Sequence, residues 1–150
     1  MPHDTSGIPC IDFINNPDPA GRSLLGVQQF RAVLTRLLRA EAEGVGASTS
    51  DLAALNDVLA RATARRGLVA TVRGYGWGWR RDPGKLLGQL FPAAWSAASL
   101  LSSDDRHRLK LCDGCQLLFV DQSRNRSRRW CDMRDCGNRE KQRRMRSAPR

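Results

Sequence analysis

The chain has 150 residues, 41% of them hydrophobic, and its 25 Lys or Arg against 15 Asp or Glu give it a formal net charge of +10. The hydrophobic share is enough for a globular core, so a wholly disordered or collagen-like chain is excluded, and the length suits one domain or one domain with a small module rather than a multi-domain enzyme. No membrane span is expected, because the longest run of large apolar residues, 117–120, is far shorter than the roughly 20 that cross a bilayer.

Two amphipathic helices are predicted in the first half of the chain. A short apolar segment, 8–16, precedes them and fits either one or two helical turns or a strand. From Ser23, a good N-cap, apolar residues recur at helical spacing as far as Gly44, and a second such pattern runs from Ser50 to a C-cap at Gly67. The residues expected to face inward are Leu24, Val27, Phe30, Val33, Leu34, Leu37 and Leu38, then Leu52, Leu55, Val58 and Leu59.

A β-hairpin is predicted after the second helix. Residues 68–73 are rich in β-branched side chains, and in 74–79 aromatic residues alternate with glycine, which places Trp77 and Trp79 on one face of the hairpin. The glycines are not a nucleotide-binding loop, because no Gly-Lys-Ser/Thr follows them. Packing of the hairpin is one interpretation of its aromatic side chains, and a surface on which a ligand stacks is the other.

A third helix is predicted over 85–101, where Pro92 should kink it or divide it in two. The chain then runs extended through 109–111 into a group of cysteines. A domain boundary is predicted near residue 105, because residues 1–105 hold 11 Lys or Arg and 10 Asp or Glu, whereas 106–150 hold 14 and 5. A nearly neutral body joined to a tail of charge +9 (14 minus 5) is expected where one end of a protein meets a polyanion.

Four of the five cysteines lie in the basic tail. They form a C-x2-C pair and, fifteen residues later, a C-x4-C pair, which are Cys112 and Cys115, then Cys131 and Cys136. The N-terminus lacks a secretion signal, so we expect a cytoplasmic protein, in which grouped cysteines bind metal rather than form disulfides. Four thiolates close the tetrahedral shell of Zn²⁺, which predicts one structural zinc ion rather than a catalytic one.

The alternatives at the cysteines are an iron–sulfur cluster, a redox disulfide, or His107 in place of one cysteine. Cys10 is expected to be a small buried side chain. Leu117, Phe119 and Trp130 supply a small core around the metal, in a zinc-bound hairpin followed by a helix from about Gly137. So small a module needs its metal to fold.

The fold class that follows is α+β and mainly α. A helical N-terminal domain with one β-hairpin, 1–105, precedes a small zinc module, 106–150, that is either treble-clef-like or ribbon-like.

The tail also carries motifs of a known family. The motifs are Cys112-x2-Cys115, Phe119-Val120-Asp121, Ser123-Arg124-Asn125, Ser127-Arg128-Arg129-Trp130-Cys131-x-Met133 and Cys136-Gly137-Asn138-Arg139-x-Lys141. They resemble the CGNR zinc finger over about residues 109–146. One departure is Asp132, which stands where serine is common.

The N-terminal segment Ile11-Asp12-Phe13-Ile14-Asn15-Asn16 resembles a motif that often opens the ABATE region of the same bacterial proteins. A role in stress-induced transcription regulation has been predicted for this helical region. The resemblance therefore implies a DNA-binding regulator. The N-terminal region is short for the family, which leaves open whether it keeps a ligand pocket.

Nine basic side chains crowd the tail outside its metal ligands. They are Arg124, Arg126, Arg128, Arg129, Arg139, Lys141, Arg143, Arg144 and Arg146. Arginine donates paired hydrogen bonds to phosphate and guanine, and Asn125 and Asn138 add amide contacts. A solvated basic face is the alternative, although nine positive charges on a small module repel one another without an anionic partner. Few aromatic residues remain to stack on unpaired bases, which favours duplex DNA over RNA, and an acidic protein is the remaining alternative.

Asp12 and Asn15 lie three residues apart near the N-terminus. They either line a ligand pocket of the helical domain or serve in caps and turns. The sequence leaves room for a small-molecule effector and for a homo-oligomer. It contains no recognisable set of nucleophile, base and orienting group, so we do not expect an enzyme.

Overall fold

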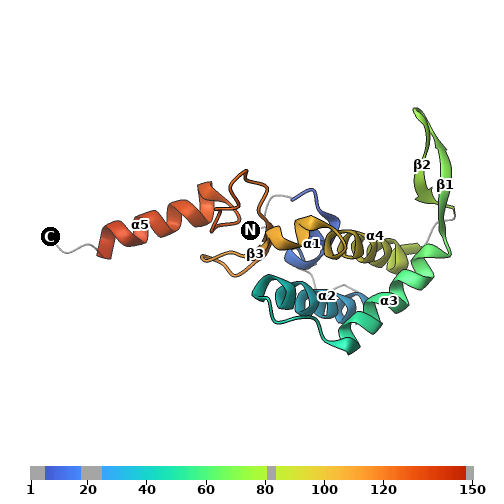
Figure 1. Cartoon of the computed structure of the whole chain (residues 1–150), viewed down its shortest axis with the longest axis horizontal. Coiled ribbons are helices and arrows are strands. Elements are labelled where there is room, and N and C mark those ends of the chain that lie inside the picture. Colours follow the sequence, from blue (N-terminus) through green and yellow to red (C-terminus); the bar gives the residue numbers. More distant parts are fainter. Residues whose placement is uncertain (1–5, 18–24, 81–83, 148–150) are drawn as a thin grey trace.

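The computed structural model describes residues 6–17, 25–80 and 84–147 (Figure 1). Its elements are α1 (Pro9–Asn15), α2 (Leu25–Glu43), α3 (Thr49–Thr63), β1 (Arg66–Thr71), β2 (Gly74–Trp79), α4 (Gly84–Leu101), the 3-10 turn η1 (Asp104–Arg108), β3 (Leu109–Leu111), β4 (Leu118–Val120), the π-helical turn η2 (Met133–Gly137) and α5 (Asn138–Ser147). The described residues are 59% helical and form two small antiparallel hairpins, which confirms the predicted fold class. None of the described helices is long and apolar enough to cross a membrane.

The first four helices pack around one hydrophobic core. Of the predicted inward residues of α2, Val27, Phe30, Leu34, Leu37 and Leu38 are buried at helical spacing, and Val33 is half-buried against the same core. The helix α4 contributes Leu90, Phe91, Ala94 and Ala97. Cys10 is fully buried in this core, as predicted. Ser23 and Leu24, predicted to begin the first helix, lie outside the described residues.

The boundaries of α3 differ from the prediction. Ser48, not Ser50, is its N-cap, because the Ser48 hydroxyl accepts a hydrogen bond from the Asp51 amide at 3.1 Å. At the other end Ala64 is the C-cap and the chain enters β1 two residues later, so the prediction of a C-cap at Gly67 is wrong.

One side-chain prediction for α3 is also wrong. Leu52 is 41% exposed, because the inward stripe consists of Asp51, Leu55, Val58 and Ala62. Asp51 is tolerated there because the Arg36 guanidinium donates two hydrogen bonds to its carboxylate, at 3.0 and 2.5 Å. The apolar pattern thus predicts that Leu52 is buried, but Asp51 is buried in its place and its charge is balanced by Arg36.

The helix α4 continues through Pro92, so it is not divided in two. A proline lacks the amide proton for one internal bond, and burial of the flanking Phe91 and Ala93 holds the helix together.

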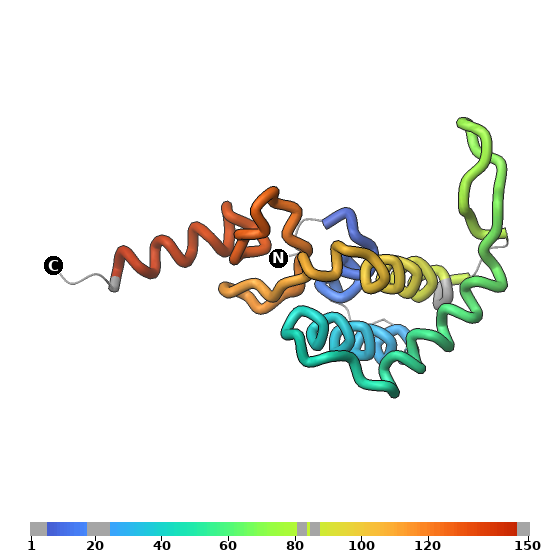
Figure 2. Tube along the Cα trace, viewed as in Figure 1, coloured from blue at the N-terminus to red at the C-terminus, as the bar shows by residue number. Residues whose placement is uncertain are grey.

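The strands β1 and β2 form an antiparallel hairpin that projects away from the helices (Figure 2). We call residues 66–79 the arm. Trp79, at its base, lies against Phe91 of α4 with ring centroids 5.5 Å apart. Trp77 lies on the same face of the hairpin but is 67% exposed, because it is beyond the reach of the helices. Packing therefore explains only the base of the arm.

The second hairpin, β3 and β4, joins two cores. Leu109 and Leu118 lie in the helical core, whereas Phe119 packs among the cysteines with Trp130. Two polar contacts reinforce this junction: Asn15 Nδ2 donates to the Leu118 carbonyl at 2.8 Å, and Arg39 Nη1 donates to the Gln116 carbonyl at 3.1 Å. The helical body, 6–104, and the C-terminal module are therefore in direct contact across residue 105.

Candidate metal centre and nucleic-acid interface

The four tail cysteines converge on one point. Cys112 follows β3, Cys115 follows the next turn, Cys131 follows an arginine-rich loop, and Cys136 lies in η2. Their four sulfur atoms all lie within 4.8 Å of one another.

The spacing of the sulfur atoms fits a tetrahedral metal. Cys131 Sγ lies 3.6 Å from Cys115 Sγ and 3.8 Å from Cys136 Sγ. Four sulfurs at the usual Zn–S distance have a mutual separation of about 3.8 Å, whereas a disulfide needs about 2.05 Å. All five cysteines are unbridged, and His107 is not in the cluster. The donor set therefore suits zinc and does not support the redox disulfide or the histidine ligand.

The local electrostatics favour a cation once the thiols ionise. Burial, followed by the neighbouring sulfurs, raises the pKa of Cys131 and raises that of Cys136 to about 12. Burial acts in the same direction on Cys112, but backbone amides of Cys131, Cys115 and Gly114 donate to its sulfur and lower its pKa to about 7. Four adjacent thiolates are stable only with a positive ion among them, because each like charge disfavours the next.

Gly114 lets the first cysteine turn approach η2 closely. A Cβ at this position would lie 3.2 Å from Cys136 Cβ and 3.5 Å from its sulfur. Phe119 and Trp130 pack on the cluster as predicted, whereas Leu117 is half-buried and lines a cavity next to α1. The apolar core around the metal site is thus smaller than predicted, because Leu117 lies toward the helical body instead.

A buried ion pair organises the loop between the cysteine pairs. Asp121 has no exposed surface, and its carboxylate accepts hydrogen bonds from Lys110 Nζ at 2.8 Å, the Ser123 amide and hydroxyl at 3.0 and 2.6 Å, and the Arg128 amide at 2.9 Å. Lys110 Nζ also donates to the carbonyls of Arg126 and Arg128, at 2.5 and 3.2 Å. These bonds hold the loop in a fixed shape and leave the side chains of Arg124, Asn125 and Arg126 exposed.

The neighbours Arg128 and Arg129 have different surroundings. Arg128 is half-buried, donates to the Cys131 carbonyl, and lies 5.6 Å from the centroid of the Phe119 ring. Arg129 is exposed, pairs with Asp113 at 2.7 Å and lies 5.2 Å from the Trp130 ring centroid. Arg128 therefore supports the metal module, whereas Arg129 is accessible to a partner.

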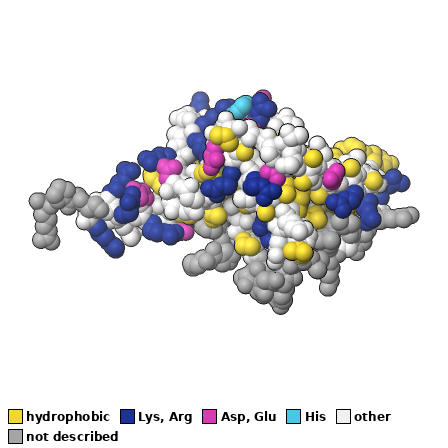
Figure 3. Space-filling model, turned by 90° about the horizontal axis from the view of Figure 1, so that it is seen from below, with side chains coloured by type: hydrophobic (Ala, Val, Ile, Leu, Met, Phe, Trp, Pro, Cys, Tyr) yellow, Lys and Arg dark blue, Asp and Glu magenta, His cyan; other side chains and the backbone are white. Residues whose placement is uncertain are grey.

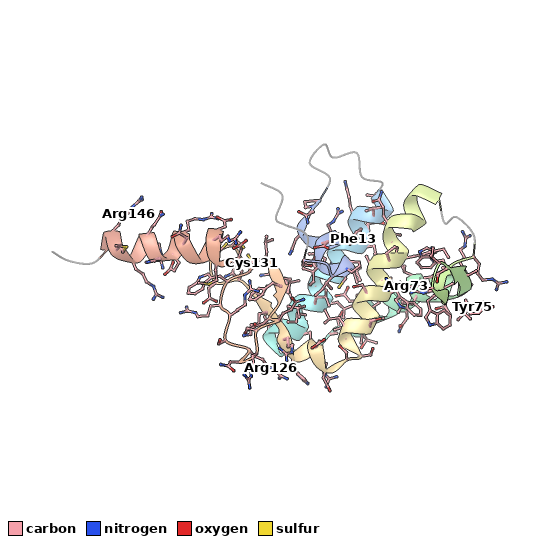
Figure 4. The ribbon with its side chains drawn as sticks, turned by 90° about the horizontal axis from the view of Figure 1, so that it is seen from above. Phe13, Arg73, Tyr75, Arg126, Cys131 and Arg146 are labelled. Carbon is pink, nitrogen blue, oxygen red and sulfur yellow. The ribbon has the colours of Figure 1, made fainter. Side chains whose placement is uncertain are left out.

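The basic residues after Cys136 lie on α5, which begins one residue after the predicted Gly137 and extends the module away from the helical body (Figure 4). Its exposed side chains include Asn138, Arg139, Lys141, Arg143, Arg144 and Arg146. Arg139 pairs with Asp135 at 2.6 Å, and Glu140 pairs with Arg143 at 2.8 Å and with Arg144 at 3.1 Å. These two arginines lower the pKa of Glu140 to about 2.

Asp12 and Asn15 line a cavity of about 200 Å³ between α1 and the C-terminal module. Arg128 and Phe119 lie on its opposite wall. Asp12 also accepts a hydrogen bond from the Ser6 amide at 2.6 Å, so it forms a turn as well. Asn15 Oδ1 is buried without a hydrogen-bond partner among the described residues.

Sequence reasoning missed the residues that position the basic side chains, namely Lys110, Asp121, Asp113 and Glu140. Lys110 lies in the segment predicted to be extended, and its alternation with Leu109 and Leu111 places it on the opposite face. Asp121 is the one acidic residue between Asp113 and Asp132, in a stretch rich in arginine. A buried carboxylate needs a positively charged partner, and this requirement is the signal that identifies the Lys110–Asp121 pair.

Comparison with protein families agrees with this site. The model of the CGNR zinc finger matches residues 108–148, and that of ABATE, described as "Putative stress-induced transcription regulator", matches residues 13–104. The chain belongs to the ABATE family. Its ABATE domain is the helical body, and its CGNR finger binds one structural zinc ion through Cys112, Cys115, Cys131 and Cys136. None of the curated proteins matches the chain.

Proposed function

We propose that this ABATE-family protein is a zinc-dependent, DNA-binding transcription regulator whose CGNR finger contacts duplex DNA. The observation that carries the proposal is the position of α5. This helix has five basic residues and one acidic residue over Asn138–Ser147, packs against η2 at its start, and projects from the body with its cationic side chains exposed (Figure 3). A helix of this kind fits the major groove of DNA.

The arginine-rich loop supports the same partner. Arg124, Asn125 and Arg126 are exposed next to the metal centre, and no ion pair joins these two arginines to a carboxylate among the described residues. Because Lys110 and Asp121 hold the loop backbone, its side chains are presented without a large ordering cost on binding. The loop and α5 then supply phosphate contacts from two parts of one zinc-bound module.

The acidic partners within the finger do not prevent such contacts. Arg139, Arg143 and Arg144 pair with carboxylates at the surface, where ion pairs contribute only about 0–1 kcal/mol. DNA phosphates or a guanine edge can replace these carboxylates, because a duplex offers a high density of negative charge. When DNA is absent, the same carboxylates orient these arginine side chains on α5.

The helical body is proposed to pass a signal to the finger. The cavity lined by Asp12 and Asn15 also contacts Arg128, a residue whose amide is held by Asp121. A small polar molecule there would change the junction between α1 and the base of the arginine-rich loop.

Selection from a pool of random duplexes, with the zinc-loaded full chain, tests the proposal. An enriched motif that is lost in the Arg143→Ala chain supports a sequence-specific regulator. Arg106→Ala, which changes an exposed arginine of η1, outside both α5 and the arginine-rich loop, is the matched control and should leave the motif unchanged. Failure to retain any duplex would instead favour the alternative, a zinc-stapled adaptor for protein or RNA.

A further inference from the structure

The arm is a second surface that the zinc finger does not explain. It lies at the opposite end of the molecule from α5, with Arg73 and Tyr75 at its outer end (Figure 4). Large apolar side chains are exposed along it: Leu68 is 64% exposed, Tyr75 80% and Trp77 67%. A soluble protein seldom exposes adjacent aromatic rings without a partner for them.

The two faces of the arm are different. Strand register places Arg66, Leu68 and Ala70 opposite Trp79, Trp77 and Tyr75, so the three aromatic rings share one face. The other face carries the three glycines of β2 and no aromatic ring, and Val69 lies over Gly78, where a Cβ would be 2.4 Å from Val69 Cγ2. Only the aromatic face therefore offers rings to a partner.

The base of the arm holds this aromatic face in place. Trp79 packs on Phe91, and the Arg66 guanidinium lies 4.2 Å from the ring centroid of Trp95 and 5.4 Å from that of Trp79. The arm is thus anchored to α4 by one aromatic residue, and the next two along the strand, Trp77 and Tyr75, remain open.

The charged residues of the arm and of its immediate flanks are all positive. Residues 58–80 contain five arginines, two of them in the arm, and no Asp or Glu. Arg65, Arg73 and Arg80 are exposed, and no ion pair joins them to a carboxylate in the part of the chain that the structure describes. The surface therefore complements a partner that is both anionic and able to stack on rings.

We propose that the arm binds single-stranded nucleic acid, with bases stacked on Tyr75 and Trp77 and phosphates held by the neighbouring arginines. Residues two apart on a strand are separated by about 6.4–6.8 Å. Successive bases in a duplex strand rise by only about 3.4 Å and expose no ring faces, so a duplex cannot occupy both rings. An unpaired strand can, because its bases are free to separate and stack on aromatic side chains.

A second copy of the chain fits the arm less well. Two arms in contact through their aromatic faces would bring the two arginines of each arm, and those next to it, close to the same arginines of the other copy, and residues 58–80 hold no carboxylate to separate them. Like charges facing one another across a contact oppose association. Nucleic acid neutralises the same arginines and covers the same rings.

The test measures binding of a labelled twelve-nucleotide oligothymidylate to the zinc-loaded full chain. The background carries Lys141→Ala, Arg144→Ala and Arg146→Ala, which reduces binding by the finger. Trp77→Ala and Tyr75→Ala should each weaken binding by at least about 5-fold, the lower range for loss of one stacked base. Trp77→Phe should retain most of the affinity, and Val72→Ala, an exposed residue of the turn, is the matched control.

Two further measurements separate stacking from charge and from self-association. The oligonucleotide should quench tryptophan fluorescence in the Trp77-containing chain, whereas inorganic polyphosphate, which has no bases, should not. Equal oligothymidylate affinity with and without Trp77 would overturn the proposal, as would a dimer in sedimentation that Trp77→Ala converts to a monomer. Duplex binding measured in parallel with Arg143→Ala reports on the finger alone, so failure of one site is distinguishable from failure of the other.

Discussion

Lys110 Nζ lies 2.8 Å from Oδ2 of Asp121, a carboxylate that is completely buried beside the metal centre. The lysine uses its remaining protons on the carbonyls of Arg126 and Arg128. One ion pair thus fixes both ends of the segment that presents the arginines of the loop.

We predict that Asp121→Ala destabilises the finger by about 2–4 kcal/mol, because it leaves the Lys110 ammonium and several amides without their acceptor. Denaturant unfolding of the zinc-loaded chain measures the loss. Ser123→Ala removes a single hydroxyl bond to the same carboxylate and should cost about 1 kcal/mol. A loss for Asp121→Ala no larger than for Ser123→Ala would show that the pair does not organise the loop.

We predict that acid weakens the helical body through Asp51. Hydrogen bonds from Arg36 lower the pKa of Asp51 against the effect of its burial, with a further contribution from Ser48. The folded-state pKa then lies below the unfolded value of about 3.9, so the stabilisation is complete above that pH and is lost as the pH falls through it toward the folded-state pKa.

Thermal unfolding between pH 6 and about 3 measures this effect. Asp51→Asn should flatten the pH dependence and lower stability at neutral pH. Asp57→Asn, which changes an exposed carboxylate on the same helix, is the control. An unchanged pH dependence in Asp51→Asn would contradict the role of the pair.

We predict that removal of zinc disorders the loop and α5 but leaves the helical body folded. The body has its own core, whereas the finger packs few apolar residues apart from the cysteines themselves. Purified protein should carry one zinc ion per chain, and Cys136→Ser should release it and raise amide exchange over residues 121–147. Cys10→Ala lies outside the cluster and should keep the metal. Full zinc content in Cys136→Ser would contradict the ligand set.

We predict two classes of effect for the arginines of α5 and of the loop before it. Arg139→Ala and Arg143→Ala should cost about 1–3 kcal/mol on a preferred duplex and relax the choice of base. Arg146→Ala and Arg124→Ala should weaken binding to all duplexes alike and lower the salt dependence by about one unit. Binding to preferred and scrambled duplexes at several salt concentrations distinguishes the two classes. Equal losses on both duplexes for Arg139 and Arg143 would indicate a nonspecific clamp.

We predict that Glu140→Gln strengthens binding to every duplex. The change releases Arg143 and Arg144 from their shared carboxylate and removes one negative charge from the proposed DNA-binding helix. The affinity should rise several-fold with a steeper dependence on salt. Asp57→Asn makes the same change of charge on α3 and is the control. Weaker binding by Glu140→Gln would mean that the carboxylate orients the arginines for DNA.

Much of the fold was predictable because it depends on local patterns. The apolar spacing of α2 and the alternation in the arm identify their elements, and two close cysteine pairs identify the zinc site. The wrong prediction in α3 concerns which of two adjacent residues is buried. Leu52 and Asp51 exchange their expected environments because Arg36, far away in the sequence, stabilises the buried carboxylate.

The arrangement of the site was less predictable, because its contacts span long separations. Asn15 reaches Leu118, 103 residues away, and no local pattern links the two. The exposure of Trp77 depends in the same way on where α4 ends and how far the arm extends. The choice of side chains for DNA stays a prediction.

The strand β4 places consecutive side chains in two different cores, with Leu118 toward the helices and Phe119 toward the cysteines. The finger is therefore not an independent folding unit, because one side of its hairpin is buried only where it packs against the helical body. Folding of the helical body also holds β4 in the position that it has beside the metal centre. Folding of the body and binding of zinc are therefore thermodynamically linked. A peptide that contains the finger alone should therefore hold zinc more weakly than the full chain does.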